Sequence, residues 1–203
     1  IKILKSEFKN LSNVNYFSNR NIMWNNFLSK IKNDKIFFIE FGVFKGNSIK
    51  YFIEHNKNNN SRFFGFDSFE GLPEDWRSNF KLYKKEYYNL IKKIPKINDS
   101  RVEFKVGWFN NTLQNFLKEL KKKPENLVIH YDADLYSSTL FCLTTIHSLG
   151  INYTAIFDQF NGDECRAFYD YYKSYNIKYK VTHYSGYSKY YPEQVILKII
   201  HNN

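Results

Sequence analysis

Four acidic side chains in this chain of 203 residues each follow or close a short apolar run: Glu40, Asp67, Asp132 and Asp158. Short continuous apolar runs are typical of strands buried inside a parallel sheet. The carboxyl ends of parallel strands meet at one edge, where open α/β sheets bind ligands, so we expect the four acids to share a rim. Such a rim would suit a cationic or hydroxyl-bearing ligand, although each acid alone could instead cap the helix that follows it.

A loop with two glycines follows the first of these acids. Gly42 and Gly46 allow the backbone to take positive φ or to approach a ligand closely. Their spacing is not the G-x-G-x-x-G of dinucleotide-binding folds, and Glu40 would repel a pyrophosphate. An acid at this place suits the ammonium and sulfonium groups of S-adenosylmethionine, and Ser48 at the next helix start could bond the carboxylate of that cofactor. We include Phe44, between the glycines, in the expected cofactor pocket.

Residues after the second and third predicted strands complete a pocket for an adenosine group. Asp67 closes the second strand and could accept hydrogen bonds from both ribose hydroxyls, with Ser68 beside it. Gly107 and Trp108 follow the third strand, where the indole ring could lie near the adenine. Trp108 could equally be an ordinary core residue.

The elements that must position these residues alternate along the chain. Helices are predicted at residues 20–31, 48–55, 112–121, 139–149 and 165–175, and strands at 36–39, 63–66, 102–106, 127–131, 153–157 and 194–200. Strands alternating with helices of about ten residues predict βαβ units. Right-handed crossovers then give an α/β, Rossmann-like, doubly wound and mostly parallel sheet. We expect one domain over residues 1–203, with an N-terminal helical extension at residues 1–34.

The segment between the second and third strands is polar, aromatic and lysine-rich. We expect a helix from Asp75 to Ile94. Residues 75–95 could fold over the site as a lid and stack on a sugar, or form a plain surface helix; the aromatic residues concerned are Trp76, Tyr83, Tyr87 and Tyr88.

The composition is that of a basic globular protein, with a formal net charge of +10 and a pI near 9.3. The lysines are scattered in short runs such as residues 121–123, so we interpret them as a solvated surface and expect no nucleic-acid partner. If the charge has a purpose, it favours an anionic substrate. Cys142 and Cys165 cannot form a disulfide framework, which indicates a reducing compartment, the cytoplasm. No apolar run approaches the ~20 residues of a membrane helix, so no membrane partner is expected.

With these residues in view, the chain resembles the macrocin O-methyltransferase (TylF-type) family, sugar methyltransferases that act on glycosylated natural products. The matching stretches are residues 64–74, 107–109, 130–139, 157–159 and 193–198. The loop at residues 40–48 also resembles the wider group that contains catechol O-methyltransferase. The resemblance spans about residues 38–200 and implies a class I methyltransferase fold, S-adenosylmethionine as cofactor, a sugar acceptor and a homo-oligomer.

The resemblance also implies a divalent metal, usually magnesium, which by position would be held by Asp132, Asp158 and Gln159. The family commonly has an acid where this chain has Gln159. Magnesium accepts a carbonyl oxygen, so an amide can still ligate it, but with one negative charge less the site would bind metal more weakly. A metal-free enzyme is therefore an open alternative.

The resemblance does not identify the general base, which must be sought among the residues of this chain. The catechol enzymes place a lysine base three residues after the first metal aspartate, and Leu135 stands there. We expect Asp132 to serve as both ligand and base, with Asp134 and His183 as further candidates.

The sequence therefore predicts an S-adenosylmethionine-dependent O-methyltransferase acting on a hydroxyl of a sugar or of a glycosylated or nucleotide-linked small molecule, such as a surface-polysaccharide precursor. One alternative is an NAD-dependent sugar oxidoreductase or epimerase, against which the missing G-x-G-x-x-G argues. The other is a non-catalytic nucleotide- or RNA-binding module. In such a module, two carboxylates that face one another, Asp132 and Asp158, would have no role.

Overall fold

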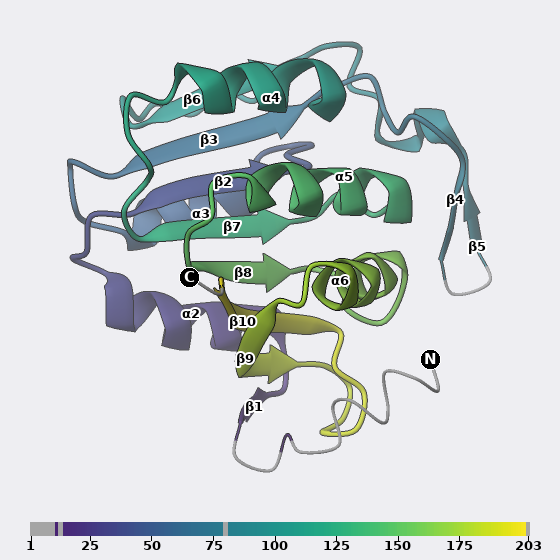
Figure 1. The fold of residues 1–203 in the computed structure, drawn as a ribbon. Helices are drawn as coiled ribbons and strands as arrows, with labels where there is room; N and C mark the ends of the chain where they lie inside the picture. The colour runs from purple at the N-terminus through teal and green to yellow at the C-terminus, as the bar shows by residue number, and fades with distance from the viewer. Residues whose placement is uncertain (1–10, 12–13, 79–80, 202–203) are drawn as a thin grey trace.

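A computed structural model describes residues 11, 14–78 and 81–201, and an eight-stranded sheet forms its centre (Figure 1). The strands are β1 (Asn15–Phe17), β2 (Phe37–Phe41), β3 (Arg62–Asp67), β6 (Val102–Val106), β7 (Leu127–Tyr131), β8 (Tyr153–Phe157), β9 (Lys178–Ser185) and β10 (Gln194–Ile200). Their order is β1-β9-β10-β8-β7-β2-β3-β6. Neighbouring strands are parallel except where β10 pairs antiparallel with β8 and β9, so the predicted mostly parallel sheet is confirmed.

Helices cover both faces of this sheet. They are α2 (Arg20–Ile31), α3 (Asn47–His55), α4 (Phe109–Glu119), α5 (Tyr136–His147) and α6 (Asp163–Ser174). Figure 1 shows α4, α5 and α6 in front of the sheet and α3 behind it. Alternate strand residues enter opposite layers: Ile129 packs with the α4–α6 layer, and Val128 packs with the α2–α3 layer. The five predicted helices are confirmed, although α4 and α5 each begin three residues earlier than expected.

The chain changes direction within the sheet between β2 and β7. From β2 it proceeds outward through β3 to β6, and it then crosses to β7 and continues outward to β8. The last residues of the two central strands, Phe41 and Tyr131, are register partners. Open α/β sheets bind ligands outside the carboxyl ends at such a switch point, so the fold itself indicates where a site should lie.

The helix predicted from Asp75 to Ile94 is wrong. The structure has a two-stranded antiparallel ribbon, β4 (Trp76–Ser78) with β5 (Lys81–Tyr83), followed by the 3₁₀ helix η2 (Lys85–Tyr88). Trp76 pairs with Tyr83 across the ribbon, with ring centroids 4.8 Å apart, and such aromatic pairs stabilise hairpins. Figure 1 shows the ribbon projecting from the side of the sheet toward which the arrowheads of the parallel strands point.

Two strands of the central sheet, β1 and β9, were not expected from the sequence. Strand β9 has the alternating pattern Tyr179, Val181, His183 of a half-buried strand, a signal that was available. The short strand β1 pairs with it in parallel. The N-terminal region therefore contributes a strand as well as the helix α2, and residues 1–10 and 12–13 of the expected helical extension lie outside the described residues.

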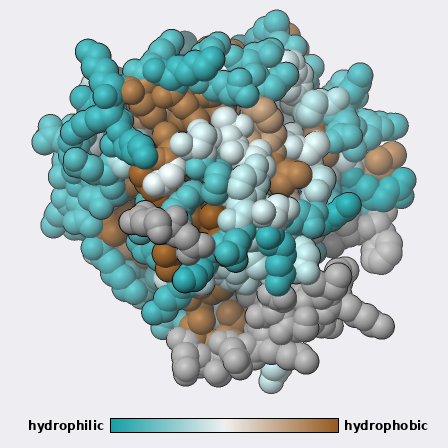
Figure 2. All heavy atoms as spheres, viewed as in Figure 1, coloured by the Kyte–Doolittle hydropathy of each residue, from teal (hydrophilic) through white to brown (hydrophobic). Residues whose placement is uncertain are grey.

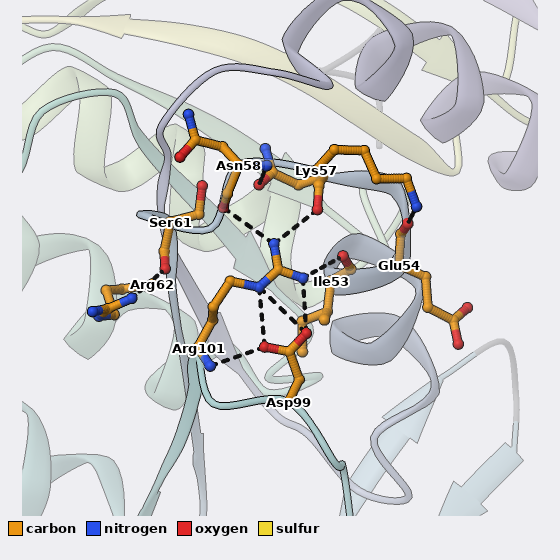
Figure 3. A network of polar contacts seen from close by, with 9 residues as sticks. Ile53, Glu54, Lys57, Asn58, Ser61, Arg62, Asp99 and Arg101 are labelled. Carbon is orange, nitrogen blue, oxygen red and sulfur yellow. Dashed lines mark hydrogen bonds and ion pairs between the residues drawn. The ribbon is translucent and has the colours of Figure 1, made fainter.

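Arg101 stabilises the sheet edge opposite the carboxyl ends, at the start of β6 (Figure 3). Its guanidinium donates to the carbonyl oxygens of Ile53 at 3.0 Å, Asn56 at 2.8 Å and Asn58 at 3.2 Å. It also pairs with Asp99 at 2.8 Å. The last carbonyls of a helix have no intrahelical partner, so Arg101 satisfies the end of α3 and fixes it to β6.

The positive charge lies on the surface of the molecule. Within the described part of the chain no lysine or arginine is buried, whereas Glu40, Asp134, Asp158 and Glu164 are. The outline of the molecule in Figure 2 is largely hydrophilic. None of the described helices is both long and apolar enough to cross a membrane.

Candidate active site

A cavity of about 850 Å³ opens at the carboxyl ends of the parallel strands. It lies at the switch point between β2 and β7, and residues following β2, β3, β6, β7 and β8 form its walls. The predicted site residues that line it are Gly42, Phe44, Asp67, Ser68, Gly107, Trp108, Asp132, Asp134, Asp158 and Gln159. The structure thus brings together residues from five separate stretches of sequence.

Glu40 does not line this cavity. Its neighbours Ile39 and Phe41 pack in the α4–α6 layer, so alternation along β2 turns Glu40 toward α2 and α3. There it is fully buried, with Oε1 2.8 Å from Nδ1 of His130. Its predicted contact with the cofactor is therefore not supported by its position.

Ser48 and His183 also lie outside the cavity lining. Ser48 is half-buried in the first turn of α3. His183 lies in β9, with Nε2 3.3 Å from Nζ of Lys30 and 3.2 Å from Oδ1 of Asn26. Burial, together with Lys30, lowers the pKa of His183 to about 4. The structure therefore does not bring His183 to the carboxylates as a base.

The glycine loop after β2 is held against two other strand ends. Gly42 has φ +88°, and a β-carbon there would lie 1.8 Å from the carbonyl oxygen of Asp132. Asp67 accepts hydrogen bonds from the backbone N–H groups of Val43 and Phe44, each at 2.8 Å. Its other oxygen accepts from the N–H of Phe69 at 2.7 Å. A carboxylate has about four acceptor positions, so Asp67 can fix the loop and still accept from a ligand hydroxyl in the cavity.

Four carboxylates, those of Asp67, Asp132, Asp134 and Asp158, line the cavity and give it an excess of acidic groups. Burial and the charges of Asp158 and Asp134 raise the pKa of Asp132 well above its usual range. Burial, Asp158 and Asp67 raise the pKa of Asp134 to about 7. Burial first, and repulsion second, favour the protonated forms of these carboxyl groups, and a bound cation would relieve the repulsion in place of the protons.

Arg20 is a residue of the cavity wall that the sequence reasoning missed. Its Nη1 donates to Oδ1 of Asp158 at 2.8 Å, and its guanidinium lies 5.2 Å from the ring centroid of Trp24. Burial acts to lower the pKa of Arg20, but Asp158 and Asp132 raise it overall. The two partners are 138 positions apart, and no local pattern could have indicated the pair.

Glu164 is a second missed residue, and it lies directly beneath the site. It is fully buried in the first turn of α6. One carboxyl oxygen accepts from the N–H of Ala133 at 3.1 Å, and the other accepts from the N–H of Gln159 at 2.9 Å. Glu164 therefore joins the loops that follow β7 and β8. An acid close after Gly162 at a helix start was the available signal.

Tyr88 from η2 contributes an aromatic wall. It lines the cavity and meets Phe44 edge to face, with ring centroids 5.2 Å apart. Tyr87, Tyr83 and Trp76 continue this series of rings at 4.9, 5.0 and 4.8 Å. Part of the 75–95 segment therefore borders the cavity, and its movement as a lid stays a prediction.

The cavity has oxygen ligands for a cation but no assembled cluster. Among the described residues, no three acidic, histidine or cysteine side chains are close enough together to hold a metal ion. Gln159 donates its Nε2 to Oδ1 of Asp134 at 3.3 Å, which leaves its carbonyl oxygen available.

Comparisons with known proteins agree with this geometry. The sequence model of the macrocin-O-methyltransferase (TylF) family matches residues 19–192. A comparison with curated proteins gave no match. The structure of the O-methyltransferase NovP is similar with a TM-score of 0.59 and 18% identity, over 85% of this chain and 76% of that chain.

Two further solved structures have the same fold. CalS11, a TDP-rhamnose 3′-O-methyltransferase, has a TM-score of 0.57 and 16% identity, over 88% of this chain and 78% of that chain. The structure described as cmcI-D160 Mg-SAM has a TM-score of 0.55 and 12% identity, over 89% of this chain and 70% of that chain. The family match covers most of the chain, and it decides against the oxidoreductase and the non-catalytic alternatives. The chain belongs to the macrocin-O-methyltransferase (TylF) family and is an S-adenosylmethionine-dependent O-methyltransferase.

Proposed function

We propose that this enzyme methylates a hydroxyl of a sugar carried by a small molecule, either nucleotide-linked or glycosylated. The observation that carries the proposal is that Gly42, Asp67, Trp108 and Asp132 line one cavity at the switch point. CalS11, whose sugar is linked to a nucleotide, is similar in fold and supports this acceptor class by analogy.

The cofactor would occupy the side of the cavity bordered by β2, β3 and β6. Asp67 is placed to accept from the ribose, and Trp108 to lie near the adenine. The close approach of Gly42 to Asp132 leaves exposed backbone where the methionine part would lie. A volume of about 850 Å³ is within the usual range for a small-molecule site and has room for cofactor and part of an acceptor.

Methyl transfer requires alignment more than it requires a base. The acceptor oxygen bonds to the methyl carbon as the carbon–sulfur bond breaks, and S-adenosylhomocysteine leaves while the hydroxyl proton passes to a base. Alignment can lower the barrier by roughly 7–11 kcal/mol. A positioned base adds about 10²–10⁴-fold. We assign the base to Asp132, because it lines the cavity, and Asp134 is the second candidate.

We also propose that the enzyme binds a divalent cation, magnesium, through Asp132, Asp158 and the carbonyl oxygen of Gln159. These are oxygen ligands of the kind magnesium prefers, and four aspartate side chains line the cavity. When bound, the cation would lower the pKa of the acceptor hydroxyl. The cmcI structure described with Mg and SAM supports this assignment by analogy. Full activity after exhaustive chelation would remove Asp158 and Gln159 from the list of functional residues.

The remaining parts of the proposal concern partners and location. The basic surface supports an anionic acceptor, such as a nucleotide-linked sugar. Both cysteines are buried and free, which agrees with the expected reducing, cytoplasmic compartment. A homo-oligomer is expected from the family.

The test is a methyl-transfer assay with S-adenosylmethionine and a panel of nucleotide-linked sugars, glycosides and simple phenols. We expect S-adenosylhomocysteine release and one added methyl group with at least one sugar. Asp132→Asn should lose turnover while it keeps its fold, and the matched control Asp34→Asn, at an exposed position, should keep both. Methylation of phenols with no sugar accepted would contradict the acceptor class. Wild-type turnover by Asp132→Asn would contradict the role of Asp132.

A further inference from the structure

The ion pair between Arg20 and Asp158 lies where the cavity meets solvent. Nη1 of Arg20 is 2.8 Å from Oδ1 of Asp158, and the side chains are 47% and 10% exposed, respectively. Asp158 is therefore nearly buried, whereas its partner has one side in water. A guanidinium in this position can leave the carboxylate without burying its own charge.

Arg20 occupies an unfavourable position at the start of its helix, and the ion pair with Asp158 stabilises the side chain in that position. Asn19 caps α2 by accepting from the N–H of Ile22 at 3.1 Å, so Arg20 is the first residue of the helix. The first turn of α2 contains no acid, and a cation at a helix N-terminus is repelled by the helix dipole. The ion pair offsets this repulsion, and the ring of Trp24 below the guanidinium helps to hold it.

The same carboxylate belongs to the proposed cation site, on which this inference rests. A guanidinium bonded to Oδ1 and a divalent cation on that carboxylate would repel one another at short range. We propose that Arg20 competes with the divalent cation for Asp158, so that the cation must displace Arg20 before it is held by Asp132 and Asp158. Arg20 is thus a positioning residue that lowers the affinity of the enzyme for metal.

The second feature of the site acts in the same direction. Gln159 contributes no charge where an acid would add one, so the site attracts a divalent cation less strongly. Its Nε2 donates to Oδ1 of Asp134 at 3.3 Å, so one oxygen of that carboxylate is already engaged. With Gln159 neutral and Asp158 already paired with Arg20, we expect weak binding of metal by the wild-type enzyme.

Manganese provides the probe, because free Mn²⁺ can be measured by electron paramagnetic resonance without any turnover. We expect Arg20→Gln to bind Mn²⁺ roughly tenfold more tightly than wild type, since a charge-assisted hydrogen bond no longer has to break. Adding Asp158→Asn to Arg20→Gln should abolish the gain. Arg166→Gln is the matched control, because Arg166 lies over the ring of Tyr136 and does not line the cavity, and it should bind Mn²⁺ as wild type does.

Equal Mn²⁺ affinity of wild type and Arg20→Gln would overturn the competition and leave the cation site standing. No Mn²⁺ binding by either would overturn both. Titration of S-adenosylhomocysteine into the same samples reports separately on the methyltransferase assignment. A measurement on the wild type avoids any effect of substitution on folding: saturating Mg²⁺ should shift the NMR signal of the Arg20 Nε–H group, and an unchanged signal would contradict the displacement.

Discussion

Gly42 lies directly against Asp132, so that a β-carbon on the glycine would stand 1.8 Å from the carbonyl oxygen of the aspartate. Gly42 also has φ +88°, a backbone conformation in which a residue with a side chain would be strained. The contact joins the loop after β2 to the end of β7 across the switch point, and it leaves room for no other residue type.

Gly42→Ala is therefore expected to move this loop away from Asp132. Affinity for S-adenosylhomocysteine, measured by calorimetry, should fall, and the strain alone should lower the free energy of unfolding by about 1–3 kcal/mol. Gly162→Ala is the control, because Gly162 has a negative φ and a β-carbon there would meet nothing within 4 Å. Normal binding by Gly42→Ala would show that the close contact is not needed.

Glu164→Ala should weaken both stability and turnover. It removes the acceptor for the N–H groups of Ala133 and Gln159, and each buried donor left without a partner costs about 1–3 kcal/mol. Glu164→Gln keeps one acceptor oxygen and should recover part of the loss in urea unfolding and in kcat. If alanine and glutamine variants behave alike, Glu164 does not act through these two hydrogen bonds.

His183 should make stability depend on pH. Burial and Lys30 lower its pKa to about 4 in the folded protein, whereas the pKa of a histidine in an unfolded chain is about 6.5. Between these values the unfolded chain binds more protons, so the contribution of His183 to stability is present above about pH 6.5 and is lost as the pH falls toward 4. His183→Gln should flatten this part of the curve of unfolding free energy against pH. An unchanged slope would contradict the lowered pKa.

Arg101→Ala should lower stability without changing the site. The variant removes the side-chain donor to three carbonyl oxygens and the ion pair with Asp99, which keeps only its bond from the backbone N–H of residue 101 (Figure 3). A loss of about 2–4 kcal/mol in urea unfolding is expected. Arg62→Ala, in the same region, removes one hydrogen bond to the carbonyl of Ser61 and should stay within about 0.5 kcal/mol of wild type. A fall in kcat for stably folded Arg101→Ala would show that the two sheet edges are coupled.

The strands and most of the rim could be predicted from the sequence because both follow from local patterns. The buried strands are apolar runs, and Asp67, Asp132 and Asp158 come at their ends and line the cavity. Glu40 comes one residue before the end of β2, and the alternation of strand side chains turns it to the other face.

The remaining features depend on contacts between distant parts of the chain. Arg20 is brought to Asp158 by packing of α2 on the sheet, and no spacing in the sequence encodes that approach. The segment from Asp75 is a different case, because Trp76 and Tyr83 pair within one hairpin, and this local pairing overrides a weak helical propensity.

Calorimetric titration of S-adenosylhomocysteine into the wild type and into Asp67→Asn tests the central claim most directly. Asp67 fixes the glycine loop and lines the cavity, so the variant would weaken both its hydrogen bonds to the loop and those expected with the ligand. The account predicts saturable binding by the wild type and a loss of roughly tenfold or more in affinity for Asp67→Asn, as expected when bonds to a charged group are removed. Absence of any binding heat in the wild type with S-adenosylhomocysteine, or equal affinity in Asp67→Asn, would contradict it.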